Sequence, residues 1–205
     1  RDKTQQLLAE YDQLAQSIFL DMFGDPITNP KGWEINELGE VVAMKAGKFV
    51  PASKIRSYNT IAPYPCYGGN GLRGYVESFT HSGEHILIGR QGALCGNVKL
   101  VSGVFHATEH AIVCSSIIEF NKTWLYYFLD LSDLNRYATG AAQPGLNVGT
   151  LVKKGIFFAP IELQNQFAEK IALIERQKDL AKKELQESED LFQALLQKAF
   201  KGELI

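Results

Sequence analysis

The 205-residue sequence has few cysteines and no long apolar run, and each shortage excludes a class of protein. Its three cysteines, Cys66, Cys95 and Cys114, are odd in number, and no two of them have the spacing of metal ligands. We therefore expect the reduced thiols of a cytoplasmic protein, without a disulfide framework or a zinc site. A run of about 18 apolar residues is missing, so we expect no membrane-spanning helix, and the N-terminus does not resemble a signal peptide.

The sequence also lacks the short motifs that mark common catalytic sites. It contains no GxSxG, Walker P-loop, HExxH or CxxC motif, no methyltransferase-type motif for S-adenosylmethionine and no PD…ExK nuclease pattern. The glycine-rich segments 67–74 and 89–96 do not open a helix after a strand, as a dinucleotide-binding loop would. We therefore predict a non-catalytic chain that binds no metal and no cofactor.

Charge is distributed unevenly along the chain, although its sum is only −2. Residues 26–158 hold 12 Lys and Arg against 9 Asp and Glu, a net charge of +3, whereas residues 1–25 carry −3 and residues 159–205 carry −2. Segment 41–76 contains five basic residues and no acidic one. Because local charge attracts phosphates, we expect a positive face here. The side chains predicted to position phosphates are Lys45, Lys48, Lys54 and Arg56.

Two segments have the periodicity of long helices. The first covers residues 4–23 and ends before Gly24; its apolar residues with the 4-3-4 spacing of a coiled-coil seam are Leu7, Tyr11, Leu14 and Ile18. The second begins after Pro160 and extends to Lys201, about 60 Å at about 1.5 Å per residue. Apart from Lys178, its seam positions are apolar or small over five heptads: Phe167, Ile171, Ile174, Ala181, Leu185, Ser188, Phe192, Leu195 and Ala199. Because such a rod is too long for its own domain to cover, we expect another helix to pack along it.

The two helical segments also share one sequence pattern. Aligning Leu14 with Leu191 matches Leu8 with Leu185, Glu10 with Glu187, Gln16 with Gln193, Ile18 with Leu195 and Phe23 with Phe200. The chain is therefore interpreted as one period of a helix–domain array, or as one of two chains that pair through their helices. The first residue is Arg1 and not Met, so we expect a fragment or a processed piece. The residues predicted to pair the helices are Leu14, Ile18, Ile174, Leu185, Phe192 and Leu195.

Short apolar runs punctuated by glycine occupy the middle of the chain. The predicted strands are Glu40–Met44, Gly74–Val76, His85–Ile88, Gly96–Leu100, Ala111–Ser115 and Gly155–Phe158, and the predicted helices are Lys122–Leu131 and Val148–Val152. Strands mixed with few helices, without a βαβ alternation, indicate an α+β fold. We predict three parts: the tail of a helix at 1–25, a mixed globular domain of many short strands at 26–160, and a long coiled-coil helix at 161–205.

Three loops of this middle part carry side chains that suit nucleic-acid contact. They lie in YPCYGGNGLRGY, in GRQG and in ATGAAQPGLN, and they offer arginines and amides that can make two-point contacts with base edges. Each residue alone is equally typical of an ordinary turn, but together with the acid-free segment they favour nucleic-acid binding. The predicted base contacts are Tyr67, Asn70, Arg73, Arg90, Gln91 and Gln143. We expect His106 and His110 to be buried and hydrogen-bonded.

The order of these motifs resembles the DNA-specificity (S) subunit of type I restriction–modification systems. The motifs are SIFLDMFGDP, GWEINELGEVV, YPCYGGNGLRGYV, HILIGRQGALCGNV, ATEHAIV, GAAQPGLNVGTLVKKGIFFAPIELQNQFAEKI and LLQKAFKGEL. The resemblance covers essentially the whole chain, and its most specific part is the closing block from Gln143 to Leu204.

The resemblance implies a non-catalytic subunit of a complex type I site-specific deoxyribonuclease. Such a subunit has two target-recognition domains, each for one half of a bipartite double-stranded DNA site, and two conserved helices that pair antiparallel and set the spacing. The helices dock methyltransferase (M) subunits, which carry S-adenosylmethionine, and the restriction (R) subunit joins that core. This chain would supply one recognition domain, at 26–160, with helix at 1–25 and 161–205.

Several alternatives remain open at this point. With one recognition domain, the chain is either a fragment of a longer S subunit or a half-subunit that dimerises through its helices. It could instead be a coiled-coil scaffold that binds protein and no DNA, or the recognition part of a fused restriction–methylation enzyme.

Overall fold

The computed structural model describes residues 2–59, 62–92, 94–140 and 144–201. They form two compact units: one combines the residues up to Met22 with those from Gln166 onward, and the other runs from Phe23 to Asn165. Mixed helices and strands with a long C-terminal helix confirm the predicted α+β class. Within the described ranges, no helix has both the length and the apolar character that crossing a membrane requires.

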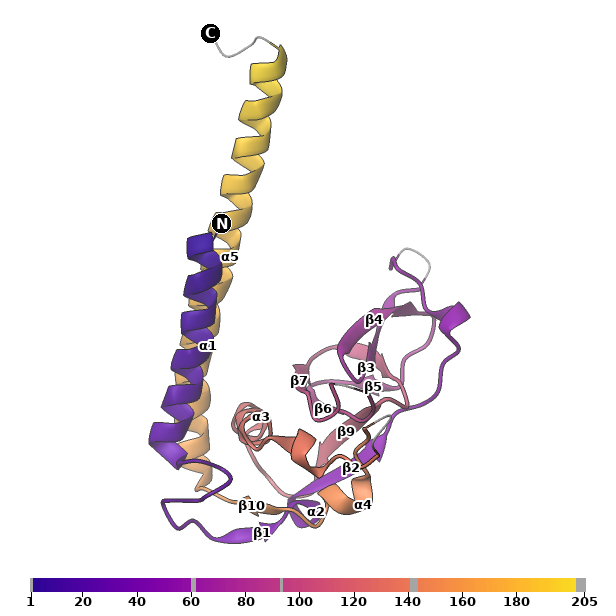
Figure 1. The fold of residues 1–205 in the computed structure, drawn as a ribbon, viewed down its shortest axis with the longest axis vertical. Coiled ribbons are helices and arrows are strands. Elements are labelled where there is room, and N and C mark those ends of the chain that lie inside the picture. Colours follow the sequence, from indigo (N-terminus) through magenta and orange to yellow (C-terminus); the bar gives the residue numbers. More distant parts are fainter. Residues whose placement is uncertain (1, 60–61, 93, 141–143, 202–205) are drawn as a thin grey trace. The chain divides into compact units, whose positions relative to one another are not determined.

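Two antiparallel helices make the first unit, which we call the helical unit. α1 (Asp2–Phe23) lies beside α5 (Ile161–Lys201), as Figure 1 shows. The ring of Phe19 meets that of Phe167 edge-on, with centroids 5.5 Å apart, and Asp12 reaches Lys178 further along. α1 ends where predicted, because Gly24 has a φ of +83°, the left-handed conformation that terminates helices.

The heptad pattern of α5 is confirmed over its first half. Phe167, Ile171, Ile174 and Ala181 are buried, and Leu185 is half-buried. Further along, the predicted seam residues are exposed, with Phe192 at 59 %. These turns lie beyond the described start of α1 (Figure 1), so no helix within the described ranges covers them. Pairing of Phe192 and Leu195 therefore stays a prediction about another helix.

The buried face of α1 differs from the predicted seam. Ala15 and Phe19 are fully buried and Ile18 is half-buried, whereas Leu14 is 47 % exposed. Small Ala15 lies at the helix–helix contact, and the larger Leu14 next to it points away from the buried face. Leu14 thus lies outside this seam, and its pairing stays a prediction about a helix of another chain.

Lys178, the misfit in the α5 heptads, is explained by two carboxylates. Its Nζ donates to Asp12 Oδ1 at 2.7 Å and to Glu175 Oε1 at 2.8 Å. Desolvation acts to lower the pKa of Lys178, but these hydrogen bonds and charges outweigh it and raise that pKa. A lysine is therefore tolerated in the apolar seam because both of its carboxylate partners are held within reach.

In the second unit, which we call the globular unit, the described residues form three sheets. One has the antiparallel order β2-β9-β6-β7, the second the order β4-β3-β8-β5 with β3 and β8 parallel, and the third joins β1 to β10. The strands are β1 (Ile35–Glu37), β2 (Val42–Ala46), β3 (Tyr64–Gly68), β4 (Gly71–Val76), β5 (His81–Ser82), β6 (His85–Gly89), β7 (Val98–Val101), β8 (Val104–Ala107), β9 (Ala111–Ser116) and β10 (Gly155–Phe157). The helices are α2 (Leu38–Val41), α3 (Lys122–Leu131) and α4 (Val148–Leu151), with 3-10 turns η1 (Ala52–Lys54) and η2 (Leu134–Tyr137).

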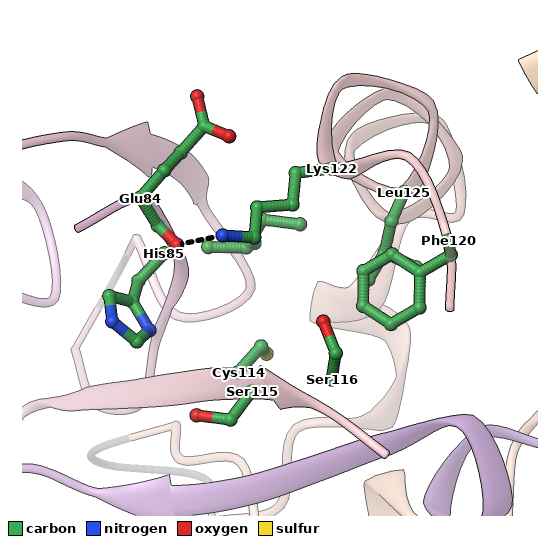
Figure 2. Close-up of a pocket in the computed structure, with 9 residues that line it drawn as sticks. Glu84, His85, Cys114, Ser115, Ser116, Phe120, Lys122 and Leu125 are labelled. Carbon is green, nitrogen blue, oxygen red and sulfur yellow. Dashed lines mark hydrogen bonds between the residues drawn. The ribbon is translucent and has the colours of Figure 1, made fainter. Parts of the chain in front are cut away.

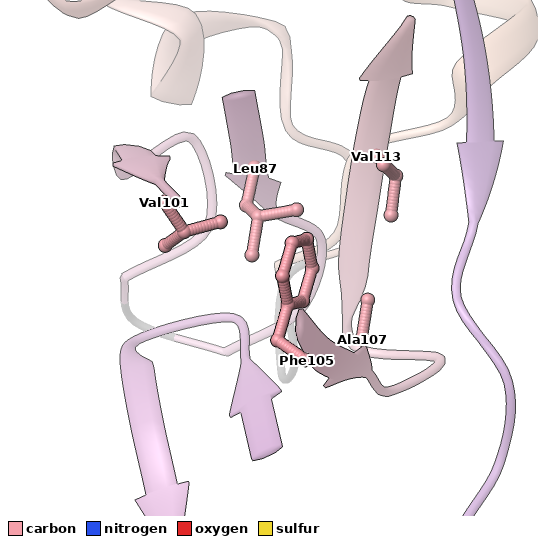
Figure 3. Close-up of a cluster of buried hydrophobic side chains, with 5 residues drawn as sticks. All are labelled: Leu87, Val101, Phe105, Ala107 and Val113. Atoms are coloured by element: carbon pink, nitrogen blue, oxygen red, sulfur yellow. The ribbon is translucent and has the colours of Figure 1, made fainter. Parts of the chain in front are cut away.

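A small apolar cluster connects the two four-stranded sheets. Leu87, Val101 and Val113 come from the first sheet, and Phe105 and Ala107 come from β8 of the second (Figure 3). All five side chains are buried, with Phe105 and Ala107 completely covered. Because both sheets supply side chains to one core, the loops at their ends are held at fixed positions.

A second core forms around the completely buried Trp124 of α3. Its ring contacts those of Phe23, Phe128 and Phe158 at centroid distances of 6.3, 5.7 and 5.4 Å. α3 begins after Asn121, whose side chain accepts from the amide of Thr123 at 3.0 Å and so caps the helix. The predicted bounds of this helix are confirmed to the residue.

Candidate nucleic-acid interface

Four segments that are distant in sequence meet at one surface of the globular unit. They are the β3–β4 turn (68–71), the GRQG segment (89–92), the β8–β9 turn (108–110) and the described loop residues before α4 (144–147). We call these residues the loop cluster. Three of the segments carry the glycine-rich motifs that the sequence singles out separately, and the fold makes them neighbours.

Backbone hydrogen bonds tie the segments together. The amide of Arg90 donates to the carbonyl of His110 at 2.8 Å, and the carbonyl of Arg90 accepts from the amide of Leu146 at 2.8 Å. Gln91 forms a β-bridge with Gly145. Because the backbone around Gln91 is bonded on both sides, Arg90 and Gln91 project from a defined position and not from a free loop.

Glycine at two positions permits this close approach. A side chain at Gly89 would collide with the carbonyl oxygen of Gly69, and one at Gly69 would bring its Cβ within 2.9 Å of the carbonyl oxygen of His110. Real Cβ atoms are almost never found so close to a carbonyl oxygen. The GRQG and YGGNG motifs therefore need their glycines for packing of one loop on the other.

Asn70 and Arg73 lie on the same hairpin, at the rim of the loop cluster. Asn70 is exposed at the turn, where its Oδ1 accepts from Asn97 Nδ2 at 3.4 Å. The stem of Arg73 passes over Gly68, since a Cβ on that glycine would lie 2.5 Å from Arg73 Cδ. The aliphatic stem of Arg73 thus packs on the backbone at Gly68, while the residue as a whole remains exposed.

A depression of about 230 Å³ opens beside Arg90 and Gln91. Thr139, Gly145 and Asn147 line its other side. Asn147 is used structurally, because its Oδ1 accepts from the amide of Gly149 at 2.8 Å and caps α4. Gln143, the remaining predicted base contact of this loop, lies outside the described residues.

The four predicted phosphate contacts are cations that all lie within the acid-free segment 41–76. Lys45 lies on β2, and the amide of Lys48 donates to the carbonyl of Ala107 at 2.8 Å, next to the loop cluster. Lys54 ends η1, and Arg56 forms a β-bridge with Tyr75 of β4. Across the parts of the chain that are described, no carboxylate forms an ion pair with any of these cations or with Arg73.

Tyr67 differs from the other predicted base contacts because it belongs partly to the core. It lies on β3, is half-buried, and its ring meets that of Phe105 edge-on at 5.6 Å. Its carbonyl accepts from the amide of Thr108 at 2.8 Å, which connects β3 to the β8–β9 turn.

The two histidines of the FHATEH segment have different surroundings. His106 is buried, with Nδ1 3.2 Å from the carbonyl oxygen of Ser78 and Nε2 3.0 Å from that of Lys48, which confirms the prediction. For His110 the prediction of burial is wrong, because its side chain is 39 % exposed at the β8–β9 turn. His110 Nδ1 lies 2.7 Å from Gln91 Oε1, a contact that sequence spacing did not indicate.

Two buried oxygens of the loop cluster are unsatisfied. Thr108 Oγ1 and Glu109 Oε2 have no hydrogen-bond partner among the described residues. Nearby, burial raises the pKa of the Cys66 thiol, with Arg73 lowering it and Glu109 raising it further. Cys66 and Arg73 of the β3–β4 hairpin therefore interact electrostatically with each other and with Glu109 of the loop cluster.

Two exposed aromatic side chains were missed by sequence analysis. Phe49 and Tyr58 are 71 % and 76 % exposed, and they flank Lys54 and Arg56 within the acid-free segment. Aromatic side chains at such positions can stack on bases or insert between them. The available signal was the position of Phe49 directly after Lys48, in a segment without acidic residues.

A separate pocket of about 80 Å³ lies between β6, β9 and α3 (Figure 2). Lys122 Nζ donates to the carbonyl of Glu84 at 2.6 Å across it. The Cys114 thiol is buried, and burial raises its pKa to about 12, which disfavours the thiolate form. Among the described residues, no group of three or more His, Cys, Asp or Glu side chains is placed to hold a metal ion.

Comparison with known proteins gives a consistent result. Residues 30–189 match the type I restriction modification DNA specificity domain. The specificity subunit of the type I restriction enzyme EcoprrI of Escherichia coli is 50 % identical over 129 residues, which are 62 % of this chain and 32 % of that protein. The chain therefore spans about a third of the length of this curated relative.

Solved structures share the fold at low sequence identity. The S subunit of a type I restriction–modification system from M. genitalium matches 96 % of this chain and 54 % of its own, with a TM-score of 0.65 and 19 % identity. A structure that describes complex assembly and conformational transition of the type I R-M system matches 100 % of this chain and 55 % of its own, with a TM-score of 0.64 and 20 % identity. Because the family match covers most of the sequence, this chain belongs to the type I restriction–modification DNA specificity domain family.

Proposed function

We propose that this chain recognises one half of a bipartite double-stranded DNA target, as a non-catalytic part of a type I specificity subunit. The observation that carries the proposal is the loop cluster, in which Arg90 and Gln91 project from a backbone bonded on both sides. Membership of the specificity-domain family supports it. In this proposal residues 26–160 are the target-recognition domain, and residues 1–25 and 161–205 are spacer helix.

Two sets of side chains would make different contacts with the DNA. Phosphate contacts fix a protein on the duplex, whereas base-edge contacts select sequence. The cations Lys45, Lys48, Lys54 and Arg56 suit phosphates. The proposed base contacts are Tyr67, Asn70, Arg73, Arg90, Gln91 and Gln143.

The helical unit would bind protein. α5 exposes Leu191, Phe192, Leu195 and Phe200 beyond α1, and exposed apolar groups of this kind mark interaction sites. We propose that the helices pair with those of a second recognition half, on the same subunit or on another copy of this chain. They would also dock the M subunit, which carries S-adenosylmethionine, and the R subunit would join that complex.

Helix length would then set the distance between half-sites. Removing one heptad from each helix shortens the rod by about 10 Å, or about three base pairs of duplex. The change is measurable as a shorter gap between the methylated half-sites, with the half-site sequences unchanged.

The direct test is selection of duplex sequences by the chain, followed by anisotropy titration of a selected duplex. Arg90→Ala should relax preference at one base pair, an effect of about 1–3 kcal/mol. The matched control is Lys182→Ala on α5. If Arg90→Ala and Gln91→Ala both leave affinity and preference unchanged, the loop cluster is not the DNA-reading surface. If the chain selects no sequence at all, DNA recognition itself is wrong.

A further inference from the structure

The ring of Tyr137 holds two cations close together. The guanidinium carbon of Arg136 lies 4.7 Å from the ring centroid, and Nζ of Lys154 lies 3.8 Å from it. The two cations are therefore no further apart than the sum of these distances. Arg136 Nη2 also donates to the Tyr137 hydroxyl. Because the face of an aromatic ring attracts cations, the ring keeps both side chains at defined positions.

The charges of Arg136 and Lys154 are not neutralised within the described part of the chain. No carboxylate there forms an ion pair with either side chain. Segment 134–161, to which both belong, contains three basic residues and no acidic one. Two cations that share one ring, without a carboxylate beside them, create a positive potential that attracts an anion.

This pair of cations adjoins the loop cluster through the chain on either side of Tyr137. Asn135 Nδ2 donates to the carbonyl of Cys95 at 2.8 Å, which attaches η2 to the loop that follows GRQG. Thr139 forms a β-bridge with Gly145 and lines the depression of the loop cluster. Tyr137 lies midway between these two attachments, so its cations are next to the proposed base contacts.

The acid-free segment 41–76 meets the loop cluster at a different place. The amide of Gly47 donates to the carbonyl of Ala111 at 3.0 Å, and the amide of Lys48 donates to that of Ala107 at 2.8 Å. These bonds attach the segment to the β8–β9 turn, whereas η2 is attached to the loop after GRQG. Positive charge therefore adjoins the loop cluster at two separate places.

We propose that Arg136 and Lys154 together bind a phosphate group of the DNA backbone, with Tyr137 as the residue that positions them. The inference rests on the proposed DNA recognition and adds a second phosphate-binding region to the four cations of segment 41–76. An arginine guanidinium presents several N–H donors to phosphate oxygens, and a lysine ammonium adds a compact charge. Since the phosphate is common to all nucleotides, this contact strengthens binding to every duplex and selects no sequence.

The test is an anisotropy titration of the complete chain with a selected duplex and an unrelated duplex, over a series of salt concentrations. Replacing Arg136 and Lys154 together with alanine should weaken binding to both duplexes about tenfold and reduce the salt slope by about 0.9 for each phosphate that is no longer neutralised. The base preference should stay unchanged. The matched control replaces Lys182 and Lys183 of α5, which removes the same charge and should leave the slope as it is.

Variants of Tyr137 separate positioning from charge. Tyr137→Leu removes the ring without changing the net charge, and we expect it to weaken binding to both duplexes about threefold and to lower the salt slope. Tyr137→Phe keeps the ring face that holds the cations, so affinity should stay within about twofold of the wild type. Added to the double alanine variant, Tyr137→Leu should have no further effect, because the ring acts only through the two cations. Thermal unfolding of each variant shows whether the globular unit is intact.

The outcomes distinguish this inference from the proposed function. If the wild-type chain selects no sequence, both are wrong. If it selects a sequence but the folded double alanine variant keeps the wild-type affinity and salt slope, DNA recognition stands and the phosphate site is overturned. A changed preference at one base pair in that variant overturns it as well, since the cations would then contact a base.

A last arm distinguishes the DNA backbone from a free phosphate. At constant ionic strength, inorganic phosphate should displace the selected duplex no better than chloride does. If phosphate displaces the duplex from the wild type, and the double alanine variant no longer responds to it, the site belongs to a free anion and the inference is overturned.

Discussion

The helical unit and the globular unit differ in two respects: whether their charged side chains form ion pairs, and whether their large aromatic side chains are exposed. α5 pairs its charges locally, as Lys182 with Asp179 at 3.3 Å and Lys183 with Glu187 at 3.7 Å, yet leaves Phe192 exposed. The globular unit buries its large aromatic Trp124, while its acid-free segment has no ion pair among the described residues. The helical unit thus exposes apolar surface, whereas the globular unit exposes unpaired positive charge.

The largest contrast concerns stability, because Trp124 of the globular unit is completely buried whereas Phe192 of the helical unit is 59 % exposed. Trp124→Ala should destabilise the globular unit by about 3–5 kcal/mol. Phe192→Ala should change stability by less than about 0.5 kcal/mol, since that side chain is largely exposed. Urea unfolding measures both, and in Trp124→Ala the remaining tryptophan, Trp33, reports on the globular unit alone. Equal midpoints for the two variants would contradict the contrast.

The next contrast concerns DNA affinity. Replacing Lys48 and Lys54 together with alanine should weaken binding to every duplex about tenfold and reduce the salt slope by about 0.9 for each phosphate that is no longer neutralised. The same change at Lys182 and Lys183 should leave the slope as it is, because those lysines are paired along α5. Anisotropy titrations over a series of salt concentrations check both. Equal effects of the two double substitutions would show that charge acts through the whole chain and not through the globular unit.

A smaller effect is expected from the one lysine inside the helical seam. Lys178→Leu removes a largely buried cation, while its partners Asp12 and Glu175 remain able to reach water. Replacing such a pair member with an apolar residue is often neutral or stabilising, here by up to about 1 kcal/mol. Thermal unfolding checks the sign, with Lys182→Leu as the exposed control. A clear decrease in stability would mean that the ion pair, and not the apolar seam, holds α1 to α5.

The smallest effect is a pH dependence confined to the globular unit. Burial lowers the pKa of His81, and the charges of His85, His106 and Lys48 lower it further. The unfolded chain therefore takes up a proton first, and stability is lost as pH falls from about 6.5, the ordinary histidine value, towards the lowered pKa. His81→Phe keeps the stacking on Phe105 and should reduce this effect. An unchanged pH profile of thermal unfolding would contradict this assignment.

The sequence predicted correctly those helices and strands that are marked by a capping residue or an apolar run within the element itself. α3 was placed to the residue, because an apolar run follows the capping residue Asn121. The predicted strands at 85–88 and 111–115 correspond to β6 and β9, which contain the apolar runs 86–88 and 111–114. β3 and β8 were missed, since β3 contains Pro65 and its parallel partner lies about forty residues away, beyond any local periodicity.

The candidate site was predicted as separate loops and not as one surface. GRQG and PGLN carry a chemical signal, but their contact depends on backbone bonds such as that between Arg90 and Leu146, which no side-chain pattern encodes. The partner of His110 was not predicted for the same reason, because its side chain contacts Gln91, nineteen residues earlier in the chain.

The pairing of β1 with β10 has a consequence for how this family changes. Ile35 lies opposite Phe157, so the chain enters and leaves the globular unit through adjacent antiparallel strands. A segment with neighbouring ends can be exchanged for an unrelated one without altering the residues on either side. Recombination between genes could thus replace everything from Leu38 to Lys154 in a single event; under the proposed function this would change the DNA target and leave the helical unit as it is.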